Sequence, residues 1–141
     1  MGRIIAIANQ KGGVGKTTTA INLAACLAEA GQKILIIDID PQGNATSGIG
    51  VDKNNVDKTV YDVILRECSI EDAIIHNVYD NLDDLPSNVN LAGAEIDLID
   101  VDRREYVLKD EISKVRKKYD YIIMDCPPSL SMLTVNAMTA A

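Results

Sequence analysis

The chain has 141 residues, of which 47% are hydrophobic and 25% are charged, which is the composition of an ordinary globular protein with one sizeable core. It excludes disordered and collagen-like chains, and no apolar run approaches the roughly 18–20 residues that a membrane-spanning helix needs. The only aromatic residues are five Tyr, so the core must be built from Ile, Leu, Val and Ala. Such a core suits a buried parallel sheet covered by helices.

The formal net charge of −7 is spread unevenly along the chain. Residues 1–50 carry 4 basic and 3 acidic side chains, whereas residues 51–141 carry 10 and 18. The acidic second part argues against a large nucleic-acid-binding surface within this chain, because such a surface needs clustered Lys and Arg. The three cysteines are far apart and form no CxxC pair, which favours free thiols in a reducing compartment. We therefore expect a cytoplasmic protein.

The first part of the chain has the pattern of a strand, a glycine-rich loop, a helix and a second strand. Residues 3–9 form a continuous apolar run, which predicts a buried strand. Apolar residues at helical spacing predict a helix over residues 16–30, and Gly31 is a typical residue to end it. Residues 33–38 predict a second buried strand, so the segment is a βαβ unit.

The rest of the chain alternates between loops, helices and strands. Residues 40–50 include three glycines and have little to bury, so they are expected to form a loop. The elements expected after this loop are a helix from a Thr59 cap to about residue 67, a helix from a Ser69 cap to residue 75, a weak strand over residues 82–85, a helix over residues 88–99, a helix over residues 103–118, a strand over residues 119–125 and a helix that includes residues 136–141.

Residues 11–18, Lys-Gly-Gly-Val-Gly-Lys-Thr-Thr, lie between a predicted strand and a predicted helix, where a phosphate-binding loop is found. Backbone N–H groups in a glycine-rich curve bind anions, and the helix N-terminus adds partial positive charge. Lys16 would supply a charge for the β- and γ-phosphates and Thr17 a hydroxyl group for Mg²⁺. The alternative is a strand-to-helix turn with an incidental lysine, but the glycines, Lys-Thr and flanking elements together favour phosphate binding.

The loop departs from the common G-x-x-x-x-G-K-[ST] pattern, because position 10 is Gln. With Lys11 before the glycines, it resembles the deviant Walker A motif of the ParA/MinD superfamily. The likeness continues through residues 38–48, 91–96 and 119–130, so that over its whole length the chain resembles the Soj-type ParA ATPases, which partition chromosomes and plasmids. The resemblance implies an α/β fold of the P-loop NTPase kind, with a parallel sheet and helices on both faces. It also implies that residues 1–141 are the N-terminal part of a single, longer ATPase domain.

The resemblance implies a role for each residue that matches a family motif. Lys11 would reach across a dimer to the phosphates held by the partner, Lys16 would hold the phosphates in its own subunit, and Thr18 would contact the α-phosphate. Asp40 would orient the attacking water. The Mg²⁺ site would use Thr17, Asp38 and, through water, Asp125. The nucleotide-binding residues would be Lys11, Gly12, Gly13, Val14, Gly15, Lys16, Thr17 and Thr18.

The reaction that the resemblance implies is hydrolysis of ATP with Mg²⁺, slow unless the protein dimerises. The implied partners are a second copy in an ATP-dependent homodimer, a stimulating protein of the ParB/Spo0J type, and nucleoid DNA, which would bind without sequence specificity to a surface beyond residue 141. No membrane partner is expected. Two alternatives are kept, namely a nucleotide-binding fragment without turnover and a membrane switch of the MinD type.

Two residues that invite a functional interpretation are expected to be structural. Cys126 has no second cysteine at a spacing suited to a metal cluster, so a buried thiol is expected. His76 is the only histidine and follows a predicted short helix without an evident carboxylate or cysteine arrangement around it, so a surface position is expected.

Overall fold

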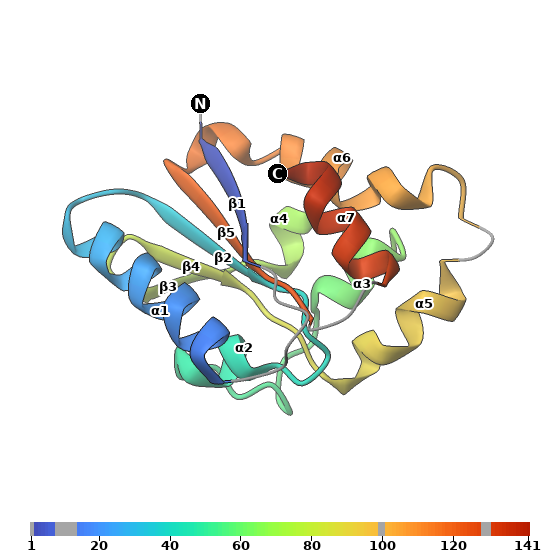
Figure 1. Ribbon diagram of the computed structural model, residues 1–141, viewed down its shortest axis with the longest axis horizontal. Helices are drawn as coiled ribbons and strands as arrows, with labels where there is room; N and C mark the ends of the chain where they lie inside the picture. The colour runs from blue at the N-terminus through green and yellow to red at the C-terminus, as the bar shows by residue number, and fades with distance from the viewer. Residues whose placement is uncertain (1, 8–13, 99–100, 128–130) are drawn as a thin grey trace.

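The computed structural model describes residues 2–7, 14–98, 101–127 and 131–141, and these residues form a five-stranded sheet with the strand order β1-β5-β2-β4-β3 (Figure 1). Four neighbouring strands are parallel, and the edge strand β3 runs antiparallel to β4. The strands are β1 (Arg3–Ile7), β2 (Ile34–Asp38), β3 (Ile75–Tyr79), β4 (Leu82–Leu85) and β5 (Tyr121–Asp125). The expected α/β fold with a mainly parallel sheet is confirmed.

Helices cover both faces of the sheet (Figure 1). One face carries α1 (Val14–Glu29) and α2 (Asn44–Gly48). The other carries α3 (Val60–Ile64), α4 (Ile70–Ala73), α5 (Ala94–Asp97), α6 (Val107–Ser113) and α7 (Met132–Ala140), together with 3₁₀ turns over Val89–Gly93, Arg104–Tyr106 and Arg116–Lys118.

The central strand β2 is buried along its whole length and divides the core in two. Alternate side chains of a strand point to opposite faces of its sheet. Ile34 and Ile36 pack in the cluster that includes α1 and α2, whereas Leu35 and Ile37 pack in the larger cluster on the other face. The aliphatic core expected from the composition is confirmed.

Helix α1 packs on the sheet through small side chains and ends where the sequence indicates. Ala20, Ala24 and Ala28 recur every fourth residue and are buried, so a narrow alanine stripe faces the strands. Gly31 has a φ of 87°, the left-handed conformation in which glycine commonly terminates a helix.

The second half of the sheet differs from expectation at its edge. Strand β3 was not expected from the sequence. Its side chains do not alternate between buried and exposed, since His76, Asn77 and Tyr79 are all exposed. A register shift interrupts its pairing with β4, and Asn77 has a φ of 56°. The weak strand expected over residues 82–85 is confirmed as β4.

Two helical predictions need correction. The predicted loop over residues 40–50 contains the short helix α2, which begins after Gly43. The continuous helix expected over residues 103–118 is broken into a 3₁₀ turn, α6 and a second 3₁₀ turn. Arg103, in the left-handed conformation with φ of 55°, prevents a helical start at that position.

The structure places both residues that were expected to be structural, Cys126 and His76. Cys126 is a fully buried thiol, as expected. His76 is largely exposed, but the absence of a carboxylate partner was wrong, because its Nδ1 lies 2.9 Å from Oδ2 of the buried Asp83. Asp83 also accepts hydrogen bonds from the Tyr119 hydroxyl at 2.6 Å and the Asn77 N–H at 2.8 Å.

Candidate functional site

Two of the predicted site residues lie where the parallel strands end. Asp38 is the last residue of β2 and Asp125 the last residue of β5, and the two are paired in register. Ile7, at the end of β1, pairs with Asp125 from the other side. Three parallel strands therefore end at one level, and open α/β sheets bind ligands at this carboxyl edge.

The predicted phosphate-binding segment, residues 11–18, follows β1 in the sequence and extends into α1. Lys11, Gly12 and Gly13 lie outside the described residues. Val14, Gly15, Lys16 and Thr17 form the first turn of α1, and Thr18 follows with an exposed side chain. The backbone of residues 14–17 therefore forms a helix N-terminus at the carboxyl edge of the sheet, as anion binding requires.

The Asp38 carboxylate is fully buried and held by hydrogen bonds from the segment that follows β2. Its Oδ1 accepts from the Asp40 N–H at 3.1 Å, and its Oδ2 accepts from the Thr46 N–H at 2.8 Å and the Thr46 hydroxyl at 2.7 Å. Burial raises the pKa of Asp38 to about 6, although the Thr46 and Asp40 donors oppose the shift, and the charge of Asp125 adds to it.

The oxygen-bearing side chains at this edge suit a Mg²⁺ site, in which Asp38 would support the bound metal. Carboxylate and hydroxyl oxygens are the ligands that Mg²⁺ takes in nucleotide sites, where it keeps several waters. A carboxylate has about four acceptor positions, and described donors occupy three of those on Asp38. Asp38 is therefore suited to hold a metal-bound water.

Asp40 lies two residues beyond β2, is almost completely buried and has one carboxylate oxygen in use. Its Oδ1 accepts from the Gln42 N–H at 3.0 Å. Its Oδ2 receives no hydrogen bond from the described residues, which leaves that oxygen able to bind a water molecule. The backbone carbonyl of Asp40 accepts from the Gly43 N–H at 2.8 Å, which closes a tight turn.

Gly43 permits this turn. Its φ of 66° is left-handed, and a Cβ atom there would lie 2.8 Å from Cδ of Lys53 and 3.2 Å from the carbonyl oxygen of Ser87. The Lys53 ammonium group in turn donates to the carbonyl of Gln42 at 2.5 Å. The segment carrying Asp40 is thus packed between two later parts of the chain.

Two residues that the sequence did not single out complete the site. Thr46, in α2, donates to Asp38, and Ser87, two residues after β4, bonds to both Thr46 and Asp40. Both are fully buried. Ser and Thr are common in loops and turns, and these two lie 41 residues apart, so no local spacing could have revealed them.

A third carboxyl group lies on the same face of the sheet. Asp84 pairs in register with Ile36, so it projects, like Asp38, toward the α1 side. It is fully buried, and neither of its oxygens has a hydrogen-bond partner among the residues that the structure describes. Burial and then the charge of Asp38 raise the pKa of Asp84 well above its usual value.

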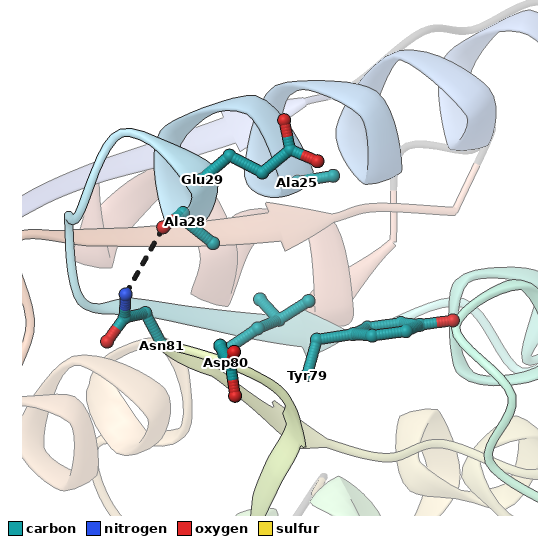
Figure 2. A pocket seen from close by; sticks show the side chains of 7 residues that line it. Ala25, Ala28, Glu29, Tyr79, Asp80 and Asn81 are labelled. Atoms are coloured by element: carbon teal, nitrogen blue, oxygen red, sulfur yellow. Dashed lines mark hydrogen bonds between the residues drawn. The ribbon is translucent and has the colours of Figure 1, made fainter.

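A hollow of about 460 Å³ lies at the opposite end of α1 (Figure 2). It is lined by Ala25, Ala28 and Glu29 of α1 and by Tyr79, Asp80, Asn81 and Leu82 of the β3–β4 hairpin. The Asn81 side chain bridges the two elements by donating to the Ala28 carbonyl at 3.2 Å. At 1.5 Å per residue this end of α1 is roughly 20 Å from the first turn, so the hollow is separate from the carboxylates.

The described residues form no separate metal site. They contain no group of three or more His, Cys, Asp or Glu side chains placed to hold a metal ion. The predicted Mg²⁺ ligands are two carboxylates and one hydroxyl group, so they would not make up such a group of three. None of the described helices is long and apolar enough to cross a membrane.

Comparisons with known proteins agree with the geometry of this edge. The AAA domain family model matches residues 2–141. The chain is 55% identical over 141 residues to the sporulation initiation inhibitor protein Soj of Bacillus subtilis, and the match covers 100% of this chain and 56% of Soj. It is 50% identical over 141 residues to the chromosome partitioning protein ParA of Myxococcus xanthus, covering 100% of this chain and 50% of that protein.

A solved structure with bound nucleotide has the same fold. The cobyrinic acid a,c-diamide synthase of Mycobacterium smegmatis, crystallised with an ATP analog and magnesium, matches with a TM-score of 0.95 and 42% identity. The match covers 100% of this chain and 57% of that chain. The chain thus spans about half the length of the relatives that it matches.

Proposed function

The chain belongs to the AAA domain family, and from that membership we propose that it binds ATP with Mg²⁺ at the carboxyl ends of β1, β5 and β2 and hydrolyses it. The observation that carries the proposal is the register of Asp38 and Asp125 at this edge, beside the helix N-terminus formed by residues 14–17. Two carboxylates and an anion-binding helix start are what a magnesium nucleotide needs. The nucleotide and magnesium in the related synthase structure support the same assignment.

The proposed roles follow the chemistry of each side chain. Lys16 holds the β- and γ-phosphates as a point charge, and residues 11–15 and Thr18 surround the phosphates with backbone N–H and hydroxyl donors. Thr17, Asp38 and Asp125 hold Mg²⁺, directly or through water. When bound, Mg²⁺ neutralises charge on the phosphate oxygens and aligns them for displacement.

Asp40 is proposed to orient the attacking water. Its Oδ2 receives no hydrogen bond from the described residues and its carboxylate is held by the bond to Oδ1, so Oδ2 can accept a hydrogen bond from the attacking water. Catalysis of phosphoryl transfer consists mainly of positioning and charge stabilisation. Lys11 from a second copy would add a further cation, which by analogy with arginine fingers is worth roughly 10³–10⁵ in rate.

At the level of the whole protein, we propose a partitioning ATPase of the ParA kind. Soj and ParA, both 50% or more identical to the chain, support this assignment over the synthase at 42% identity. ATP would drive homodimerisation, the dimer would bind DNA without sequence specificity, and a ParB-type protein would stimulate hydrolysis in the cytoplasm at the nucleoid.

The test of the proposed site is nucleotide binding. The full-length natural protein is titrated with a fluorescent ATP analogue, with and without Mg²⁺, as the unmodified chain, Lys16→Ala and the control Lys117→Ala, whose lysine is exposed. We expect tight, Mg²⁺-dependent binding that only Lys16→Ala weakens, by tenfold or more, since a charge-assisted contact is worth about 1.5–3 kcal/mol. Equal affinities in all three proteins would contradict the assignment.

A further inference from the structure

Ser87 is a buried polar residue that joins two parts of the proposed site and has no proposed role so far. It follows β4 and Pro86 directly and is fully buried. Its backbone N–H donates to the Thr46 hydroxyl at 3.0 Å, and its own hydroxyl donates to the backbone carbonyl of Asp40 at 2.9 Å. Ser87 therefore contacts both ends of the segment that carries Asp38 and Asp40.

The hydrogen bond from the Ser87 N–H fixes the direction in which the Thr46 hydroxyl group donates. A backbone N–H can only donate, so the Thr46 oxygen must accept from Ser87 and direct its own hydrogen elsewhere. That hydrogen goes to Oδ2 of Asp38, at 2.7 Å. The chain of donors Ser87, Thr46, Asp38 therefore has one polarity, and each bond in such a chain strengthens the next.

The second contact fixes the backbone of Asp40. Its carbonyl oxygen accepts from Gly43 within the turn and from the Ser87 hydroxyl outside it. The Asp40 N–H bonds to Asp38 at the end of β2, and the Ser87 bond adds a second tie, because Ser87 follows β4, which is paired with β2. The carbonyl of Pro86, next to it, also accepts from the Val60 N–H at 2.9 Å, so the anchoring segment is itself held.

We propose that Ser87 is a positioning residue for ATP hydrolysis, which acts by holding the Asp40 backbone directly and the Asp38 carboxylate through Thr46. The inference rests on the proposed function, since it assumes that Asp40 orients the attacking water. A small displacement of such a group lowers the rate of the chemical step without changing how the phosphates are bound.

The test compares Ser87→Ala with Ser113→Ala in the full-length natural protein. Ser113 is a matched control, because its hydroxyl also donates to a backbone carbonyl, that of Asp110, at 2.6 Å, but on the exposed side of α6. We expect single-turnover hydrolysis to slow by roughly ten- to a hundredfold in Ser87→Ala, with the Kd for ATP within about twofold of the unmodified value. Ser113→Ala should match the unmodified protein in both.

Three results would overturn the inference, and they are distinguishable. No hydrolysis by the unmodified protein refutes the proposed function and the inference with it. Hydrolysis by Ser87→Ala at the rate of Ser113→Ala refutes the inference alone. A weakened Kd for ATP with an unchanged rate also refutes it, because that result describes a structural role.

A second pair of variants decides the matter if Ser87→Ala does not fold. Thr46→Ser keeps the hydroxyl that joins Ser87 to Asp38, whereas Thr46→Val keeps the shape and removes the hydroxyl. We expect Thr46→Ser to retain most of the rate and Thr46→Val to be at least about tenfold slower. Equal rates in the two variants would overturn the inference.

Discussion

Asp84, on the strand next to Asp38, has a fully buried carboxyl group that receives no hydrogen bond within the described part of the chain. A buried polar group without a partner costs roughly 1–3 kcal/mol in proteins, so Asp84→Val should raise the free energy of unfolding at pH 7 by about that amount. Valine also suits a strand. Urea denaturation measures the change, with the exposed Asp102→Val as the control. A less stable Asp84→Val protein would contradict this interpretation.

The pH dependence of stability provides a second prediction for Asp84. Burial, and then the charge of Asp38, raise its folded pKa well above the unfolded value, near 3.8. Between these two pKa values the folded state binds a proton that the unfolded state has lost, so stability falls as the pH rises. The advantage of Asp84→Val over the unmodified protein should therefore grow from pH 5 to pH 8. An advantage that shrinks over this range would show that the carboxyl is charged and compensated.

Among the described residues, the Tyr119 hydroxyl donates the shortest hydrogen bond to the buried Asp83, at 2.6 Å. Burial alone would raise the pKa of Asp83, but the donors from Tyr119, Asn77 and His76 lower it, so the carboxylate is charged and stabilised. Tyr119→Phe should lower the free energy of unfolding by about 1.5–3 kcal/mol, the range for a bond to a charged group. The matched control is Tyr61→Phe, which removes an exposed bond to Asp97 of 2.7 Å. Equal losses in the two variants would contradict the prediction.

At the scale of elements, one side chain joins α6 to α7. The buried Asn136 of α7 accepts from the Leu108 N–H at 3.1 Å and donates to the Arg104 carbonyl at 2.9 Å, so it caps the first turn of α6 from outside. Asn136→Ala leaves both backbone groups without this partner and should cost about 2–4 kcal/mol, measured by urea denaturation. Val135→Ala, on the exposed side of α7, should cost much less. A small loss in Asn136→Ala would mean that water replaces the cap.

Elements whose own pattern decides their burial could be predicted from the sequence, whereas elements shaped by contacts such as that of Asn136 could not. Long apolar runs and a helical alanine spacing predicted β1, α1, β2 and β5 closely, because their pattern alone decides which face is buried. The helix expected over residues 103–118 is interrupted at its start, where Arg103 has a left-handed backbone and Asn136, from another helix, bonds to the Leu108 N–H. Edge strand β3 was missed because three of its five side chains are exposed.

The candidate site divides in the same way. Asp38, Asp40 and Asp125 could be proposed because they follow strands and match a family motif, and the structure brings the ends of those strands together. Thr46 and Ser87 could not, because their bonds join segments that are distant in the sequence. Asp84 could not be singled out either, since a sequence pattern does not tell whether a buried acid has a hydrogen-bond donor beside it.

At the scale of the whole molecule, the proposal makes dimerisation depend on ATP. Asp40→Ala should bind ATP but not hydrolyse it, so ATP should trap the dimer. Light scattering on the full-length natural protein should give twice the monomer mass for Asp40→Ala with ATP, and the monomer mass with ADP. Lys16→Ala should be monomeric in both. A monomeric Asp40→Ala protein with ATP would contradict the proposed coupling of nucleotide to dimerisation.

The proposed function requires that the carboxyl edge formed by β1, β5 and β2 hydrolyses ATP and that Asp40 orients the attacking water. Phosphate release at saturating Mg²⁺-ATP tests it most directly, in the full-length natural protein and in Asp40→Ala, with the exposed Asp80→Ala as the control. We predict turnover in the unmodified protein and in Asp80→Ala, and a rate at least about a hundredfold lower in Asp40→Ala with ATP binding retained. Turnover by Asp40→Ala at the unmodified rate would contradict the proposed role of Asp40. Binding of ATP by the unmodified protein without any turnover would contradict the proposed hydrolysis.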